Sequence, residues 1–179
     1  MITIIASTNR PNSMTLKVAK ATKILLQKMT DEKVLLLDLV KVDFEKLNAP
    51  AYESTSTYAN EIRSKYFIPT QKILFITPEY NGSFAGILKY FMDVISTVDF
   101  EKTFPQKKAA IIGVAQGRAG NLRGLTHLTS ILMHMGMWVM PKNLPISIIN
   151  NQFESEKEFN APTQKSVEDL LAYFIKIAS

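Results

Sequence analysis

Cysteine is absent from the 179-residue chain. Without a thiol, the protein cannot form a disulfide, a thiolate zinc site or a CxxC redox pair, and it cannot use a cysteine nucleophile. Any oxidation or reduction would therefore depend on a bound cofactor to carry the electrons. Hydrophobic residues make up 46% and charged residues 21% of the sequence, a balance typical of a globular chain rather than a disordered one.

Signals for membrane insertion and export are also lacking. No apolar run is long enough to span a bilayer. Residues 1–6 form an apolar run with no basic segment before it and no cleavage pattern after it. We therefore expect a cytoplasmic protein that has no membrane partner.

Acidic residues are missing from two long stretches, 1–30 and 102–153. The bases in these stretches are Arg10, Lys17, Lys20, Lys23, Lys28, Lys102, Lys107, Lys108, Arg118, Arg123 and Lys142. Within a net charge of +5, this placement indicates an anionic ligand such as a phosphate or nucleotide, although ordinary solvated surfaces would look similar. The bases are not interleaved with aromatic residues and no nucleic-acid-binding motif is present, so we expect no nucleic-acid partner.

Strands and helices are predicted to alternate along the chain. Short apolar runs predict strands, and apolar residues spaced three and four apart predict helices. The predicted strands are 1–6, 34–39, 72–77, 109–115 and 145–149, and the predicted helices are 15–29, 86–97, 122–135 and 167–177. Residues 40–58 are expected to form a loop with one helical turn, and residues 60–70 a partly helical segment that Pro69 ends.

Strands that are apolar throughout are typical of a parallel sheet with helices on both faces. Five of them favour an α/β, flavodoxin-like three-layer sandwich with strand order 2-1-3-4-5. We find no repeat and no linker, and we predict a single domain over residues 1–179. In this strand order a ligand binds beyond the carboxyl ends of strands 1 and 3, where the order reverses.

The loop after the first strand is suited to a phosphate. It carries hydroxyls and one guanidinium and runs directly into a helix, whose first backbone N–H groups are free to bind an anion. Ser13 is the expected N-cap, and Leu16 stands where a capping-box carboxylate would compete for those groups. The helix dipole would add on the order of 0.3–1 kcal/mol. Taken alone, this could equally be an ordinary capped loop.

The loop after the third strand is suited to a flat ligand. Gly82 and Gly86 allow close approach of the backbone, and Tyr80 and Phe84 supply aromatic surface. Backbone amides there can hydrogen-bond the edge of a ring system. A turn with incidental aromatic residues is the alternative interpretation.

Together the two loops resemble those of the NADPH-dependent FMN reductase family, a flavodoxin-like group that includes quinone, azo and chromate reductases. The family motif G-S-x-R-x-x-S is matched by S-T-N-R-P-N-S at residues 7–13, and P-E-Y-N by residues 78–81. The following L-K-x-x-x-D is matched by L-K-Y-F-M-D at residues 88–93. Ala6 stands before Ser7 where the family has glycine, and Val94 stands where many members have tryptophan.

The resemblance implies an FMN site built from three loops. By this resemblance Ser7, Arg10, Ser13, Met14 and Thr15 would bind the phosphate, and Pro78, Glu79, Tyr80, Asn81, Gly82 and Ser83 would border the isoalloxazine. The loop at residues 116–121 would close the other side of the ring through Gln116 and Gly117. This loop follows a strand beside the third, so it can reach the same ligand.

The same resemblance implies an NAD(P)H-dependent oxidoreductase. Hydride would pass from NADPH or NADH to FMN and then to a quinone, azo compound, flavin or similar acceptor in a ping-pong cycle. Because the cofactor does this chemistry, we predict no catalytic side chain. Family members are commonly homodimers or homotetramers, and the same is expected here.

Two alternatives to turnover stay open. The chain could be a flavodoxin-like electron carrier or flavin-binding module, although flavodoxins are usually acidic and this chain has a pI near 9.3. It could also be a relative that has lost FMN. The acceptor and the preference between NADPH and NADH are not specified by the sequence.

Other candidate sites are less well supported. Gly113, Gly117 and Gly120 have the wrong spacing and position for a dinucleotide-binding glycine loop. His127 and His134 are expected on one helix, about 10 Å apart at about 1.5 Å per residue, too far to share a metal ion. We therefore predict no metal site.

Overall fold

A computed structural model describes residues 1–47 and 56–177. Its strands are β1 (Ile2–Ala6), β2 (Val34–Asp38), β3 (Lys72–Pro78), β4 (Lys108–Val114), β5 (Trp138–Val139) and β6 (Leu144–Ile146). Its helices are α1 (Met14–Met29), α2 (Thr57–Ile62), α3 (Gly86–Ile95), α4 (Phe100–Thr103), α5 (Leu122–His134) and α6 (Ala161–Lys176). Short helical turns η1 (Leu39–Lys41), η3 (Arg63–Phe67) and η4 (Ile149–Asn151) complete the description.

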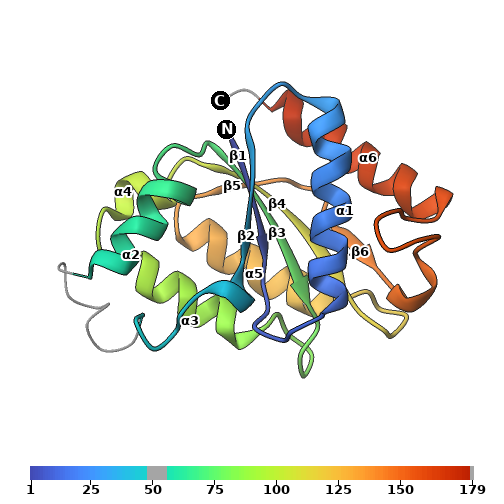
Figure 1. Cartoon of the computed structure of the whole chain (residues 1–179), viewed down its shortest axis with the longest axis horizontal. Helices are drawn as coiled ribbons and strands as arrows, with labels where there is room; N and C mark the ends of the chain where they lie inside the picture. The colour runs from blue at the N-terminus through green and yellow to red at the C-terminus, as the bar shows by residue number, and fades with distance from the viewer. Residues whose placement is uncertain (48–55, 178–179) are drawn as a thin grey trace.

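The strands form one parallel sheet in the order β2-β1-β3-β4-β5, with β6 also pairing with β4 (Figure 1). This confirms the predicted α/β, flavodoxin-like fold and its strand order. The carboxyl ends of β1 and β3 lie side by side at one edge of the sheet, because Ala6 pairs with Ile76. The loops that follow these strands therefore start from neighbouring points.

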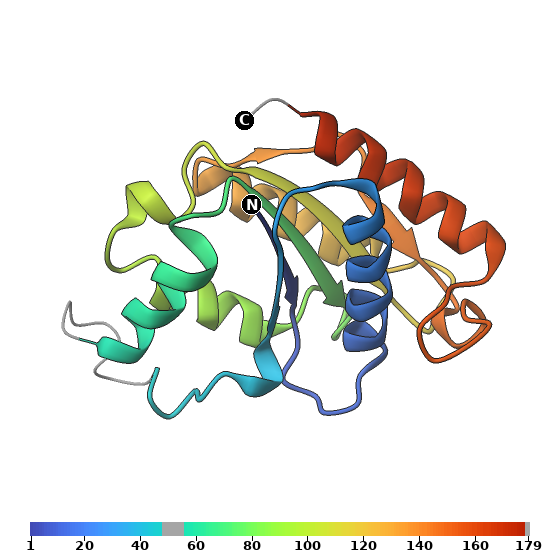
Figure 2. The same cartoon turned by 45° about the horizontal axis from the view of Figure 1, so that its top comes forward.

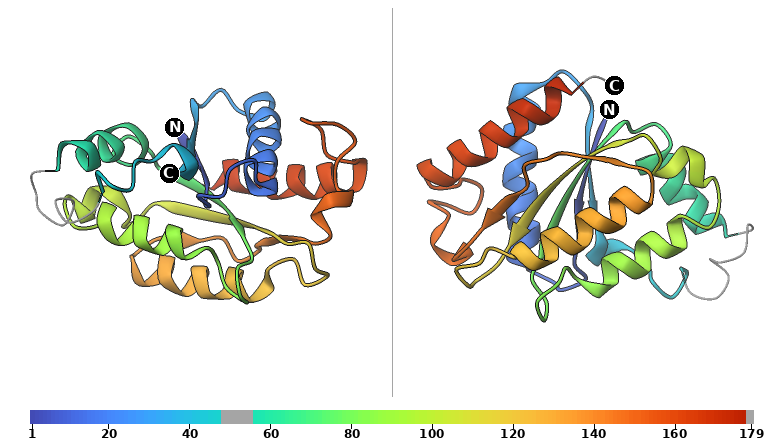
Figure 3. Two further views of the ribbon diagram at one scale, coloured as in Figure 1. Left: turned by 60° about the horizontal axis from the view of Figure 1, so that its bottom comes forward. Right: turned by 180° about the vertical axis from the view of Figure 1, so that it is seen from behind.

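Helices cover both faces of the sheet, as alternate strand residues show. Ile4 and Leu74 face a core completed by α1 and α6, whereas Ile5 and Phe75 face one completed by α3 and α5. Figure 2 shows α1 and α6 near one another, and the view from behind in Figure 3 shows α3 and α5 in front of the sheet. Within the described residues, no helix combines the length and apolar character needed to cross a bilayer.

The fifth strand differs from the prediction of residues 145–149. In the structure it is divided: β5 pairs with Lys108 and Ala109, and β6 pairs with residues 112–114. Pro141, which has no N–H to donate, lies between the two pieces. Ile148 has a φ of 48°, so the chain leaves the extended conformation soon after β6.

The other predicted helices begin and end within two residues of the prediction, but α6 and the segment over residues 60–70 differ more. α6 starts at residue 161 rather than 167, because Asn160 caps it by accepting a hydrogen bond from the Thr163 N–H at 3.0 Å. The partly helical segment predicted over residues 60–70 consists of α2 and the π-helical η3, and it ends before Pro69. In the predicted loop over residues 40–58, residues 48–55 lie outside the described part of the chain.

Candidate functional site

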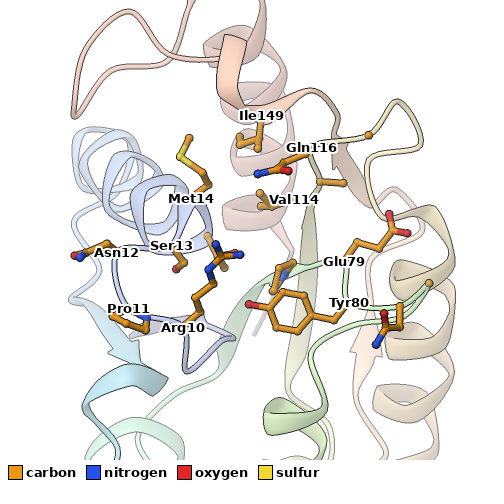
Figure 4. A pocket seen from close by; sticks show the side chains of 16 residues that line it. Arg10, Pro11, Asn12, Ser13, Met14, Glu79, Tyr80, Val114, Gln116 and Ile149 are labelled. Carbon is orange, nitrogen blue, oxygen red and sulfur yellow. The ribbon is translucent and has the colours of Figure 1, made fainter.

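A cleft of about 690 Å³ opens where β1, β3 and β4 end (Figure 4). This volume falls in the range of small-molecule sites, about 300–1,000 Å³. The lining residues come from the three loops that the sequence singled out and from the turn after β6. They are Arg10, Pro11, Asn12, Ser13, Met14, Thr15, Pro78, Glu79, Tyr80, Asn81, Gly82, Val114, Ala115, Gln116, Gly117 and Ile149.

Two predicted site residues do not line this cleft. Ser7 is fully buried, and its hydroxyl donates to the Ile5 carbonyl at 3.3 Å. The Ser83 hydroxyl is hydrogen-bonded to Nδ1 of His127 at 3.0 Å. The contacts that Ser7 and Ser83 would make with FMN stay predictions.

The sequence analysis did not single out five of the lining residues. Pro11 and Asn12 lie inside the quoted first loop, and Val114 and Ala115 lie where β4 ends. These four could have been found from their place in the predicted topology. Ile149 could not, because it was assigned to the last strand rather than to the turn that follows it.

The first loop ends in an exposed set of backbone donors. Ser13 caps α1 as predicted, since its Oγ accepts from the Leu16 N–H at 3.1 Å. The N–H groups of Met14 and Thr15 have no acceptor in the described part of the chain. They lie at the positive end of the α1 dipole, where an anion is stabilised. Arg10 lines the same cleft, and in Figure 4 its side chain extends in the direction of Ser13.

The third loop is a tight two-residue turn. The backbones of Tyr80 and Ser83 exchange hydrogen bonds of 2.9 and 3.1 Å, and Asn81 and Gly82 both have positive φ, 52° and 76°. This is the type I′ geometry, which favours Asn-Gly. The N–H groups of Asn81 and Gly82 make no hydrogen bond within the described residues. They are therefore available to the edge of a ring system.

A hydrogen bond joins the first and third loops. The Tyr80 hydroxyl lies 2.7 Å from Oγ1 of Thr8, which also accepts from the Arg10 N–H at 3.2 Å. The third loop is tied to β4 as well, through the Glu79 N–H and the Val114 carbonyl at 3.0 Å. The walls of the cleft are thus connected to each other before any ligand enters. The sequence analysis predicted Tyr80 as aromatic surface bordering the flavin ring and did not predict its hydrogen bond to Thr8.

Charge in the cleft is sparse. Arg10 is the lining base and Glu79 the lining acid, and Glu79 points away from Arg10 in Figure 4. In the described ranges, no three His, Asp or Glu side chains lie close enough to hold a metal ion. The cleft can therefore bind one anionic group at its α1 end and a neutral ring at its other end.

Comparison with known proteins identifies the family. The family model for NADPH-dependent FMN reductases matches residues 1–151, which include every element that lines the cleft. The chain belongs to this family. The predicted membership is confirmed, and with it an oxidoreductase family of NAD(P)H-dependent FMN and quinone reductases.

Two curated members of the family illustrate the relationship. The chain is 41% identical to an NAD(P)H-dependent FMN reductase of Pseudomonas aeruginosa over 87 residues, 47% of this chain and 45% of that protein. It is 25% identical to a quinone reductase of Pseudomonas putida over 183 residues, 98% of this chain and 95% of that protein. The first alignment therefore spans less than half of the P. aeruginosa protein, whereas the second spans nearly all of the P. putida protein.

Solved structures agree on the fold. The flavoenzyme FerB of Paracoccus denitrificans, an NAD(P)H:(acceptor) oxidoreductase, superposes with a TM-score of 0.77 at 21% identity, covering 97% of this chain and 94% of FerB. Oxidised flavodoxin 1 of Bacillus cereus superposes with a TM-score of 0.59 at 15% identity, covering 99% and 98%. At these identities the likeness shows a common fold.

Proposed function

We propose that this family member is an FMN-dependent NAD(P)H oxidoreductase that reduces a small acceptor such as a quinone, an azo compound or a flavin. In this proposal the FMN phosphate binds at the N-terminus of α1, and the isoalloxazine lies between residues 78–83 and 116–117. The observation that carries the proposal is the pairing of free donors in one cleft. Met14 and Thr15 present N–H groups for an anion, and Asn81 and Gly82 present N–H groups for a ring edge.

At the phosphate end, the residues provide donors and one positive charge. The Ser13 hydroxyl already accepts from the helix, so its own proton is free to be donated to a phosphate oxygen. Arg10 offsets part of the phosphate charge and can donate two parallel hydrogen bonds. No acid lines this end, since residues 1–30 contain no Asp or Glu. The site therefore favours a monoester dianion.

At the ring end, the chain provides shape and exclusion of water. Val114, Ala115 and Ile149 are buried and line the cleft at the end of β4 and in the turn after β6, where they form an apolar wall. Gln116 and Gly117 line the same cleft and are exposed, so they are free to contact a ring that lies against residues 78–83. When bound there, FMN would accept a hydride from reduced nicotinamide and pass two electrons to the acceptor, and no side-chain acid or base is needed for the hydride step.

The cofactor, the co-substrate and the assembly follow the family resemblance. We propose FMN with NADPH or NADH, and a homodimer or homotetramer. A flavodoxin-like electron carrier is the alternative, and the net charge of +5 favours the reductase, because flavodoxins are usually acidic. The two differ in turnover, since a carrier would not oxidise NADPH repeatedly.

The test is reconstitution followed by turnover. The purified protein is mixed with FMN, and its visible absorption is recorded before and after NADPH is added without oxygen. We expect bound FMN, bleaching of the flavin band, and its recovery when a quinone is supplied. Steady NADPH oxidation with the quinone supports the reductase, whereas binding without turnover supports the carrier. Absence of bound flavin after reconstitution would contradict both.

Paired variants locate the phosphate. Arg10→Gln should weaken FMN binding about tenfold or more, because a hydrogen bond to a charged group contributes about 1.5–3 kcal/mol. It should leave riboflavin, which has no phosphate, unaffected. Lys28→Gln makes the same change of charge at the opposite end of α1 and should alter neither affinity.

A further inference from the structure

Asn121 is a buried polar residue that the proposed mechanism does not use. It immediately precedes α5 and is fully buried, with a φ of 67°. Asparagine at this position ordinarily caps its helix by accepting from a backbone N–H in the first turn. Here the side chain makes no capping hydrogen bond. The Asn121 side chain therefore does not act as a helix cap.

The Asn121 side chain is directed to the neighbouring strand. Its Nδ2 donates to the Thr77 carbonyl at 3.2 Å, and Thr77 is followed directly by the loop 78–83. Its Oδ1 is buried without a donor among the described residues, which carries a desolvation cost. One hydrogen bond thus links the end of the loop 116–121 to the start of the loop 78–83.

Two glycines make room for this link. Thr77 pairs with Gly113 of β4, so the Asn121 side chain must pass over Gly113 to reach β3. A Cβ at Gly113 would lie 3.1 Å from the Asn121 Cβ and 2.6 Å from the Gly120 carbonyl oxygen. A Cβ at Gly124 would overlap with Oδ1 of Asn121 and lie 2.8 Å from the Phe84 N. A side chain at Gly124 would therefore displace the Asn121 amide, and a side chain at Gly113 would collide with the carbonyl of Gly120, the residue before Asn121.

We propose that Asn121 is a positioning residue that sets the separation between the two loops enclosing the flavin ring. Asn121 ends the loop that carries Gln116 and Gly117. Its side chain is hydrogen-bonded to the end of β3, which leads to Asn81 and Gly82. The inference rests on the proposed function, since it assumes that the ring lies between these loops. It adds a specific determinant of ring binding that lies outside the cleft.

Two substitutions test the link without altering the cleft lining. Asn121→Gly deletes the amide and tolerates the positive φ. Asn121→Asp keeps the shape but loses the donor when ionised, whereas its protonated form can again donate to the Thr77 carbonyl. Asn143→Gly is the matched control. Asn143 also donates one hydrogen bond, to Thr129 at 3.0 Å, and its buried Oδ1 has no donor within residues 1–47 and 56–177, but it lies outside the cleft.

Dissociation constants for FMN and riboflavin are measured by the quenching of flavin fluorescence. Asn121→Gly should raise both dissociation constants about tenfold, so the ratio of the FMN constant to the riboflavin constant should not change. Arg10→Gln, in contrast, changes that ratio. Asn143→Gly should bind both flavins like the wild type, even if its melting temperature falls as far as that of Asn121→Gly.

The Asn121→Asp variant adds a pH signature. Burial raises the pKa of the introduced carboxyl, so flavin affinity should be weak at pH 8 and recover toward that of the wild type as the pH falls to 5. Arg123, beside Gly82, and His127, bonded to Ser83, are the titratable side chains that α5 presents to the same loop. The wild type and Asn121→Gly contain both, so their pH profiles isolate the new carboxyl. The melting temperature of each apoprotein is measured at the same pH values, and weak binding at pH 8 by a variant that is folded there distinguishes positioning from a purely structural role.

Each outcome is decisive. Wild-type affinities in Asn121→Gly, or no recovery in Asn121→Asp, overturn this inference and leave the proposed function standing. Failure of the wild type to bind either flavin overturns both. If Asn121→Gly does not fold, Asn121→Asp at low pH still reports whether the donor controls ring binding.

Discussion

Ser13→Asp should separate helix capping from phosphate binding. Ser13 caps α1 through a 3.1 Å hydrogen bond from the Leu16 N–H and also lines the cleft. Aspartate is as good an N-cap as serine and interacts favourably with the helix dipole. The free energy of unfolding of the apoprotein should therefore stay the same or rise slightly, while a carboxylate now occupies the anion site.

The expected loss of FMN affinity can be estimated from Coulomb's law. Two unit charges 4 Å apart repel by about 1 kcal/mol in water and about 4 kcal/mol at an effective dielectric constant of 20. A phosphate monoester carries about −1.5 to −2 charges at pH 7. Even with the dielectric constant of water, the repulsion therefore lowers the binding free energy of FMN by about 2 kcal/mol. At about 1.4 kcal/mol per factor of ten, the dissociation constant rises about 30-fold.

The assay compares FMN with riboflavin in low and moderate salt. FMN binding should weaken at least about 30-fold, and the effect should shrink as added salt screens the repulsion. Riboflavin affinity and the melting temperature of the apoprotein should be unchanged. Equal losses for both flavins, or unchanged FMN affinity, would show that the phosphate does not bind at the start of α1.

Three further predictions address the loops and the core. Gly82→Ala should lower the free energy of unfolding by about 1 kcal/mol and the melting temperature by about 3 °C, because Gly82 has a φ of 76°. Gly117→Ala is the control and should melt like the wild type, because a Cβ at Gly117 would have no atom of the described residues within 4 Å. Tyr80→Phe and Thr8→Val should each lower the free energy of unfolding, measured in urea, by about 1 kcal/mol, because each removes the same 2.7 Å hydrogen bond. If the two losses simply add in the double variant, the two side chains are not coupled and the prediction is wrong. Lys107 is buried and donates to the Thr70 carbonyl at 2.6 Å, and burial lowers its pKa below the ordinary 10.5. Because the unfolded chain then holds more protons between the lowered pKa and 10.5, the wild type should gain stability relative to Lys107→Met as the pH rises through that window, and a falling difference in urea midpoints would contradict this.

The central strands could be predicted from the sequence because they are buried on both faces. β1, β3 and β4 are apolar almost throughout, so their pattern needs no knowledge of what packs on them. Their order then placed the cleft, since the loops after β1 and β3 start from neighbouring strand ends. The Asn81-Gly82 pair likewise specified its own turn.

The edge of the sheet could not be predicted in the same way. β5 and β6 are each paired with β4 on one side only, and the exposed Trp138 and Pro145 give no alternating pattern. The early start of α6 was missed because residues 161–166 are mostly exposed and carry no apolar period. The Ser7 hydroxyl turns back to the Ile5 carbonyl, and the Ser83 hydroxyl bonds His127, which is distant in sequence. Motif spacing reveals neither direction.

The divided last strand has a consequence for the protein at high concentration. A long, straight outer strand is a template on which the strands of other molecules can assemble. Here that margin is interrupted at Pro141, and Pro145 within β6 has no N–H to offer, while the opposite margin is the short β2. The side of the sheet formed by β5 and β6 therefore presents no continuous ladder of donors and acceptors, so it resists the edge-to-edge pairing from which fibrillar aggregates grow.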